Sequence, residues 1–187
     1  MAVIIVPSCH FRDRKARISR SLCSTTIERL EKTASIADRH ELKNAPIVVT
    51  GRVVHGGDRL SSLMLLFLEK NFPELRHRSL IEGSGVGIFS EAELVTAMLP
   101  EDEKLVIVSS WWYFLPGRII WESFASIKGQ KIELVPTPRT TLFSLLFYIA
   151  YGFVVHASYL LGREKQLADF LTKRQQTRKF NFRFKGC

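Results

Sequence analysis

The stretch KLVIVS (Lys104–Ser109) decides the fold, because a short run of Val, Ile and Leu predicts a buried central strand of a parallel sheet. Two runs of the same kind precede it, AVIIVP (Ala2–Pro7) and PIVVT (Pro46–Thr50). Weaker strands are predicted at Arg78–Ile81 and Lys131–Val135. Strands that are separated by helices predict right-handed crossovers and a sheet covered on both faces.

Helical spacing fills the intervals between these strands, over residues 24–40, 58–71, 90–99 and 116–127. Thr25 and Glu28 have the spacing of a capping box. Ser90 and Glu93 form a second one, and Asp58 is a further expected N-cap. We therefore expect a three-layer, doubly wound α/β domain over residues 1–139, with a mainly parallel five-stranded sheet. A long apolar and then basic C-terminal helix over 140–173 and a basic tail over 174–187 would follow.

The net charge of +9 is concentrated in two segments of the 187-residue chain. Residues 163–187 hold eight Lys or Arg and two acids, and Arg12–Arg20 holds five Lys or Arg and one acid. Such segments are solvated surface, or they bind nucleic acid or anionic lipid. Cys9, Cys23 and Cys187 lack metal-ligand spacing, which favours free thiols. With no secretory signal at the start, we expect a cytoplasmic protein, with membrane association left open.

No charged residue occurs between Arg139 and Arg163. The segment Leu142–Leu161 has twenty residues, enough to cross about 30 Å of hydrocarbon. Its small and polar residues recur at helical spacing, and they are Ser144, Tyr148, Tyr151, Gly152, His156 and Tyr159. This stripe is typical of a helix packed on the sheet or on a second copy of the chain, or of one in a membrane interface. We expect His156 to be a hydrogen-bonded residue of the tyrosine stripe and not a ligand.

Ligands of open parallel sheets bind beyond the carboxyl ends of the strands, so the loops at those ends hold the candidate site residues. Glycine lets backbone N–H groups approach a ligand closely, and arginine or histidine binds a phosphate or carboxylate. The candidates are Ser8, His10, Gly51, Arg52, Gly56, Gly57, Asp58, Gly83, Ser84, Gly85, Glu91, Ser110, Trp112 and Arg118. His10 is the candidate for acid–base chemistry, because its ordinary pKa lies near neutrality.

Some of these residues have a structural interpretation as well. Arg118 has the spacing of an ion pair with Glu122, although a cation in the first turn of a helix also indicates an anion bound there. The segment GSGVG (Gly83–Gly87) lacks the GxGxxG spacing and is typical of a plain turn as well as of a nucleotide loop. The sequence has no HExxH, P-loop or GxSxG motif, and no metal site is expected.

Three segments resemble the ElyC/SanA/YdcF-like family from about Val3 to Pro138: PIVVTGR, GIFSEAELV and VSSWWYFLPGR. The resemblance implies a Rossmann-like parallel fold, a link to cell-envelope biogenesis and S-adenosylmethionine as a ligand. The chain departs from the family pattern at Phe89–Ser90, where the family has Asn-Thr. The family's histidine is replaced by Tyr113 or Phe114, and the first loop reads Pro7-Ser8-Cys9-His10 in place of the usual glycines.

Together these observations predict a domain that binds a small anionic ligand, either nucleotide-like or phosphorylated, with catalysis left open. A first alternative is a membrane-associated envelope factor without catalysis, which the uncharged helix and basic tail would hold on anionic lipid. A second alternative is nucleic-acid binding by the tail, where aromatic and basic residues alternate. These are Lys179, Phe180, Phe182, Arg183, Phe184 and Lys185.

Overall fold

A five-stranded parallel sheet forms the centre of the computed structural model, which describes residues 1–8, 22–52, 58–85, 87–138 and 142–177. The strand order is β3-β2-β1-β4-β5. The strands are β1 (Ala2–Pro7), β2 (Ile47–Thr50), β3 (Ser79–Glu82), β4 (Lys104–Ser110) and β5 (Lys131–Thr137). The chain therefore runs outward from β1 and then returns to β4 beside it, so the topological switch point lies between β1 and β4.

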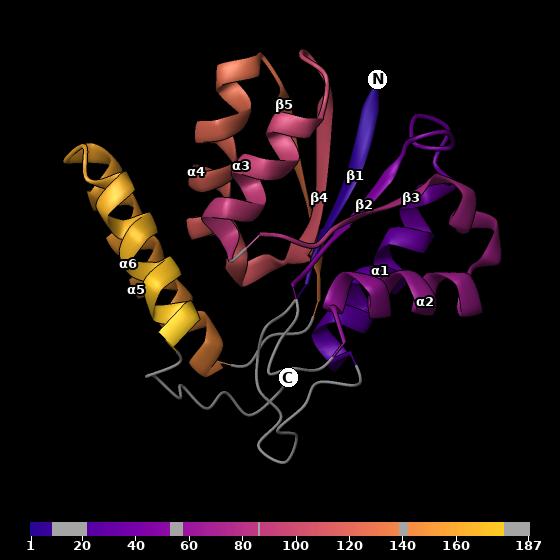
Figure 1. Ribbon diagram of the computed structural model, residues 1–187, viewed down its shortest axis with the longest axis horizontal. Coiled ribbons are helices and arrows are strands. Elements are labelled where there is room, and N and C mark those ends of the chain that lie inside the picture. Colours follow the sequence, from indigo (N-terminus) through magenta and orange to yellow (C-terminus); the bar gives the residue numbers. More distant parts are fainter. Residues whose placement is uncertain (9–21, 53–57, 86, 139–141, 178–187) are drawn as a thin grey trace.

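Helices cover both faces of the sheet, which confirms the predicted three-layer α/β fold (Figure 1). They are α1 (Ser24–Ala37), α2 (Leu60–Asn71), α3 (Ile88–Met98), α4 (Phe114–Ala125), α5 (Leu142–Leu160) and α6 (Glu164–Thr177), with short 3-10 turns η1 (Pro73–Arg78), η2 (Trp111–Tyr113) and η3 (Ser126–Lys128). In Figure 1, α1 and α2 lie on one side of the sheet, α3 and α4 lie on the other, and α5 and α6 lie beyond them.

Two hydrophobic clusters hold these layers together, because successive side chains of a strand point to opposite faces. Ile4 and Val6 of β1 belong to the cluster under α1 and α2, while Val3 and Ile5 belong to the cluster under α3 and α4. The three central strands β1, β2 and β4 are almost fully buried, whereas the edge strands β3 and β5 are partly exposed. The Val- and Ile-rich runs of the sequence thus became a sheet covered on both faces, as predicted.

The helix caps differ from those predicted, although α1 begins at the predicted residue, Ser24. The capping-box prediction at Ser90 is wrong: α3 begins two residues earlier, because Gly87 turns the chain at φ 103°, and the Ser90 hydroxyl donates to the Gly87 carbonyl over 3.2 Å. The box at Thr25 is wrong as well, since α1 begins at Ser24 and Cys23 takes the N-cap position without a side-chain cap. Arg59, not Asp58, precedes α2 as its N-cap.

The predicted single C-terminal helix is two helices. Gly162 adopts φ 62°, which ends α5, and α6 starts two residues later. The two helices contact each other, and Leu167 and Leu171 of α6 pack against the same cluster as Tyr151 and Tyr159 of α5. Within the described part of the chain, no helix has the length and apolar character that crossing a membrane requires.

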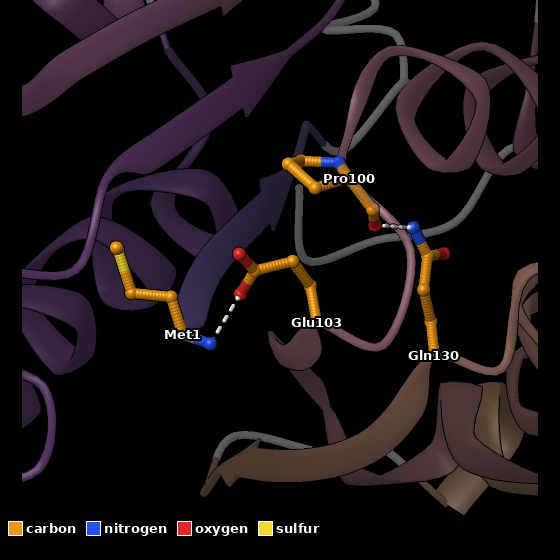
Figure 2. A network of polar contacts seen from close by, with 4 residues as sticks. All are labelled: Met1, Pro100, Glu103 and Gln130. Atoms are coloured by element: carbon orange, nitrogen blue, oxygen red, sulfur yellow. Dashed lines mark hydrogen bonds and ion pairs between the residues drawn. The ribbon is translucent and has the colours of Figure 1, made fainter.

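The amino ends of the strands form an edge closed by polar contacts (Figure 2). The Met1 backbone nitrogen lies 3.0 Å from Oε2 of Glu103, just before β4. Nε2 of Gln130, just before β5, donates to the Pro100 carbonyl over 2.8 Å. Nζ of Lys128 donates to three backbone carbonyls at the end of α3, with distances of 2.5 to 3.2 Å. Most of the polar groups described at this amino edge thus have a partner.

Candidate functional site

The opposite edge collects small hydroxyl residues where the strands end. The strand register pairs Pro7 with Thr50 and Ser110 with Thr137, so the carboxyl ends of four strands are level. Buried hydroxyl oxygens at these ends have no hydrogen-bond partner among the described residues, and they belong to Ser8, Thr50, Ser109 and Thr137. A buried hydroxyl without a partner costs about 1–3 kcal/mol, so four at one edge need a reason beyond packing.

A buried arginine spans the switch point at this edge. Arg29 lies on the inner face of α1 and is only 3% exposed. Its Nη1 donates to the Pro7 carbonyl of β1 over 2.7 Å, and its Nη2 donates to the Ser110 hydroxyl of β4 over 3.2 Å. Its Nε has no partner, and none of the described acidic side chains forms an ion pair with it. A buried cation of this kind is stabilised by an anion.

Tyr113 places an aromatic ring beside this cation. The centre of the Arg29 guanidinium lies 5.9 Å from the centroid of the Tyr113 ring, within the range of a cation–π contact. A Cβ atom at Gly117 would lie 2.6 Å from this ring, so glycine is needed for the ring to pack on α4. Burial around the hydroxyl, and then the charge of Glu91, raise the pKa of Tyr113 well above its usual range. Tyr113 therefore remains a neutral hydrogen-bonding group at physiological pH.

Glu82 organises the loop after β3. Its Oε1 accepts hydrogen bonds from the Ser84 backbone nitrogen over 2.7 Å, the Ser84 hydroxyl over 2.6 Å and the Gly85 backbone nitrogen over 3.2 Å. Gly85 is needed here because a Cβ atom would lie 2.6 Å from Cγ of Glu91. The backbone donors of Ser84 and Gly85 thus hold the Glu82 carboxylate, and Gly85 packs against Glu91 in the first turn of α3.

Gly51 lets the ends of β1 and β2 approach each other closely. Its φ is 154°, and a Cβ atom there would lie 2.7 Å from the Ser8 hydroxyl oxygen. Its carbonyl accepts a hydrogen bond from the Ser61 hydroxyl of α2 over 2.8 Å. Its backbone nitrogen donates to the Glu82 carbonyl over 3.1 Å. Gly51 is thus a packing residue between three strand ends.

The predicted site residues divide into three groups. Ser8, Gly51, Glu91 and Ser110 are buried, and their contacts with one another, Arg29 and Tyr113 bring them to the carboxyl edge. Gly85 is buried as well, against Glu91. Arg52 is half-buried, as is Gly83, where a Cβ atom would lie 2.5 Å from Arg59.

The second group lies in solvent. Asp58 is exposed, and so is Ser84. The Arg118 side chain is 66% exposed, and its Nε donates to Oε1 of Glu122 over 2.7 Å, which is the ion-pair interpretation that the sequence left open. The third group lies outside the described residues or side chains, and comprises His10, Gly56, Gly57 and the side chain of Trp112. The tail residues Lys179–Lys185 also lie outside them.

Arg29 is not among the predicted site residues, because it lies in the helix α1 and not in a loop after a strand. A signal was present: α1 buries Thr26, Leu30, Thr33 and Ala37, and Arg29 falls on the same helical stripe. A charged residue on a buried stripe indicates a polar partner in the interior. Thr50 and Thr137 were also missed, since a hydroxyl at the end of an apolar strand is expected to belong to the core.

The fold and this edge define a class of protein: a doubly wound α/β domain with a buried cation and unpaired hydroxyls at its switch point. Comparison of the chain with models of known families, with curated proteins and with solved structures finds no match. The resemblance to the ElyC/SanA/YdcF-like family therefore stays a prediction. Among the described residues, no group of three or more His, Cys, Asp or Glu side chains has the arrangement to hold a metal ion.

Proposed function

We propose that the carboxyl edge binds a small ligand that carries a phosphate or carboxylate, at the switch point between β1 and β4. The observation that carries this proposal is the Arg29 guanidinium, which is buried beside two strand ends with its Nε unpartnered. A guanidinium binds phosphate and carboxylate oxygens through short, charge-assisted hydrogen bonds. The first turn of α1 begins at the same edge, and its macrodipole favours negative charge there.

A second observation that supports the proposal is the set of buried, unpartnered hydroxyls of Ser8, Thr50, Ser109 and Thr137. Hydroxyl groups donate to phosphate oxygens and accept from sugar hydroxyls, so their spread over four strand ends suits a ligand longer than a phosphate ion. Tyr113 offers a neutral ring against which a base or sugar can stack. A nucleotide-like or phosphorylated compound therefore fits better than an inorganic anion, and S-adenosylmethionine belongs to the same panel because it combines a nucleoside with a carboxylate.

A thermal-shift screen of nucleotides, phosphosugars and S-adenosylmethionine tests this proposal. At one hundred times its Kd, a ligand raises the free energy of unfolding by about 2.7 kcal/mol, which is several degrees of Tm for a domain of this size. We expect Arg29→Met to lose this shift and Arg118→Ala to retain it, since Arg118 is exposed and paired with Glu122.

Ser109→Ala gives a second test that leaves the arginine in place, in case Arg29→Met does not fold. It removes a buried hydroxyl that has no partner among the described residues, so the fold should tolerate it, and it should reduce the ligand-induced shift. A panel that shifts neither the wild type nor the Arg118→Ala variant would overturn the proposal, as would a shift that survives both substitutions at the carboxyl edge.

A further inference from the structure

One side of α5 exposes a row of large apolar side chains. They are Leu146, Phe153, Val154 and Leu160, with exposed fractions of 60%, 73%, 52% and 75%, and Leu161 follows at 69%. Ala150 and Ala157 are exposed between them. The spacing of three, four and seven residues places these side chains on one face of the helix, which we call the outer face.

The polarity of α5 is the reverse of that of an ordinary surface helix. Its inner face carries Tyr151, Gly152, Val155 and Tyr159, which pack toward α4. The Tyr159 hydroxyl lies 2.7 Å from the Ser123 hydroxyl of α4, so hydroxyl groups point inward. The outer face has His156 at its margin, exposed, and is otherwise aliphatic or aromatic. A helix that faced water alone would carry its polar residues on the outside.

Basic residues follow the outer face along the chain. Arg163, Lys165 and Lys173 are exposed around α6, whereas residues 140–162 carry no charge. Over residues 163–187 the chain has eight Lys or Arg against Glu164 and Asp169, a net charge of +6. Phe170 of α6, 59% exposed, adds a further apolar side chain beside these cations. An apolar helix face that is followed along the chain by a basic segment complements a surface that is apolar within and negative at its boundary.

We propose that the outer face of α5 lies on the surface of an anionic lipid bilayer, with the exposed cations Arg163, Lys165 and Lys173 contacting the headgroups. The helix would lie in the interface and keep its inner face on α4, without crossing the bilayer. A second copy of this chain is a poorer occupant, because pairing through the same face would bring the exposed cations Arg163, Lys165 and Lys173 of two copies together. This inference concerns a surface away from the carboxyl edge, and it holds whether or not that edge binds a ligand.

Co-sedimentation of the full chain with vesicles tests the inference. We expect binding to phosphatidylcholine–phosphatidylglycerol vesicles, weak binding to pure phosphatidylcholine, and a loss of binding as salt concentration rises. Phe153→Asp removes an apolar contact and introduces a negative charge that the negative headgroups repel. The partition coefficient should therefore fall at least about tenfold. Leu160→Asp should have the same effect.

Ile127→Asp is the matched control, because Ile127 is 80% exposed in η3 at the end of α4 and does not belong to the outer face. It should bind vesicles like the wild type, and all three side chains are exposed enough that the fold should be unaffected. Equal binding of wild type and Phe153→Asp would overturn the inference. A dimer in sedimentation equilibrium that Phe153→Asp disrupts, without binding to anionic vesicles, would also overturn it and assign the face to a second copy.

Discussion

The two edges of the sheet differ in whether their buried polar groups have hydrogen-bond or ion-pair partners. At the amino edge, Glu103 pairs with the Met1 nitrogen, and Lys128 donates to three carbonyls of the α3 end. Arg78 donates to the backbone carbonyls of four residues within 37–45. Among the described side chains of this edge, Oε1 of Gln130 has no partner, and Oε2 of Glu103 has the Met1 nitrogen as an ion-pair partner but no hydrogen bond.

The carboxyl edge has four buried hydroxyls and the Nε of a buried arginine without partners. Both edges arise from the same strands, so the difference comes from the residues chosen at the strand ends. The unpaired polar groups of the carboxyl edge lower the free energy of unfolding, and a ligand that hydrogen-bonds them would restore it. This difference supports the proposal that the carboxyl edge binds a ligand, whereas the polar contacts of the amino edge stabilise the fold.

Lys128→Met should have the largest effect on stability, because it breaks the satisfied edge. The variant leaves the carbonyls of Thr96, Ala97 and Leu99 without their charged donor, which should lower the free energy of unfolding by about 2 kcal/mol. Lys131→Met is the control, since Lys131 is exposed at the start of β5. Urea denaturation measures the difference, and equal midpoints for the two variants would mean that the amino edge is not held in this way.

Thr50→Val and Thr137→Val should change stability in the other direction. Each removes a fully buried hydroxyl that has no partner, so the free energy of unfolding of the ligand-free protein should rise by about 1 kcal/mol. Thr96→Val is the matched control, because its buried hydroxyl donates to the Ala92 carbonyl over 2.7 Å and its loss should destabilise. If thermal denaturation gives all three variants the same sign, the contrast between the edges is wrong.

The sequence pattern predicts the strands and the position of the candidate site, but not the helix boundaries. The Val- and Ile-rich strands, their order along the chain and the rule for ligand position all follow from pattern, and they lead to the correct fold and to the carboxyl edge as the candidate site. The helix boundaries do not, because Gly87 and Gly162 turn the chain at places that periodicity alone cannot locate.

The residues of the candidate site were harder to predict than its position. Arg29 and Ser110 are 81 residues apart and meet only through packing of α1 on the sheet. For Arg118, spacing allowed both an ion pair and an anion contact, and only the exposure of the side chain distinguishes between them. The unpartnered state of a hydroxyl such as Thr50 is a property of its surroundings in three dimensions, so no sequence pattern encodes it.

Alkaline pH should weaken the carboxyl edge through Tyr113. Its raised pKa means that the folded state keeps a proton that the unfolded chain releases above about pH 10. The stability from this group is therefore complete below pH 10 and falls as pH rises beyond it. Tyr113→Phe has no phenol to titrate, so its stability should fall less between pH 9 and about pH 11 than that of the wild type. Parallel curves in urea denaturation would contradict this account of Tyr113.

Glu103→Gln should have the smallest effect of the four. The partner of Glu103 is the backbone nitrogen of Met1, whose side chain is 80% exposed, so water reaches this ion pair although the Glu103 side chain is only 11% exposed. Ion pairs that water reaches contribute about 0–1 kcal/mol. In the variant, the amide oxygen can still accept a hydrogen bond from the Met1 nitrogen. Urea denaturation should therefore show a change in the free energy of unfolding below about 1 kcal/mol. A much larger loss would mean that this ion pair, and not Lys128, holds the amino edge together.

The most direct test of the central claim follows the Arg29 Nε–H group by two-dimensional ¹H–¹⁵N NMR during titration with nucleotides and phosphosugars. Arg29→Lys assigns the resonance, because that variant lacks it. The account predicts that a ligand of this class moves the Arg29 Nε–H resonance in a saturable way, since the unpartnered donor gains an acceptor. It also predicts that Thr50→Val weakens the titration. A resonance that stays unchanged across the whole panel would contradict the claim that the carboxyl edge is built for a ligand.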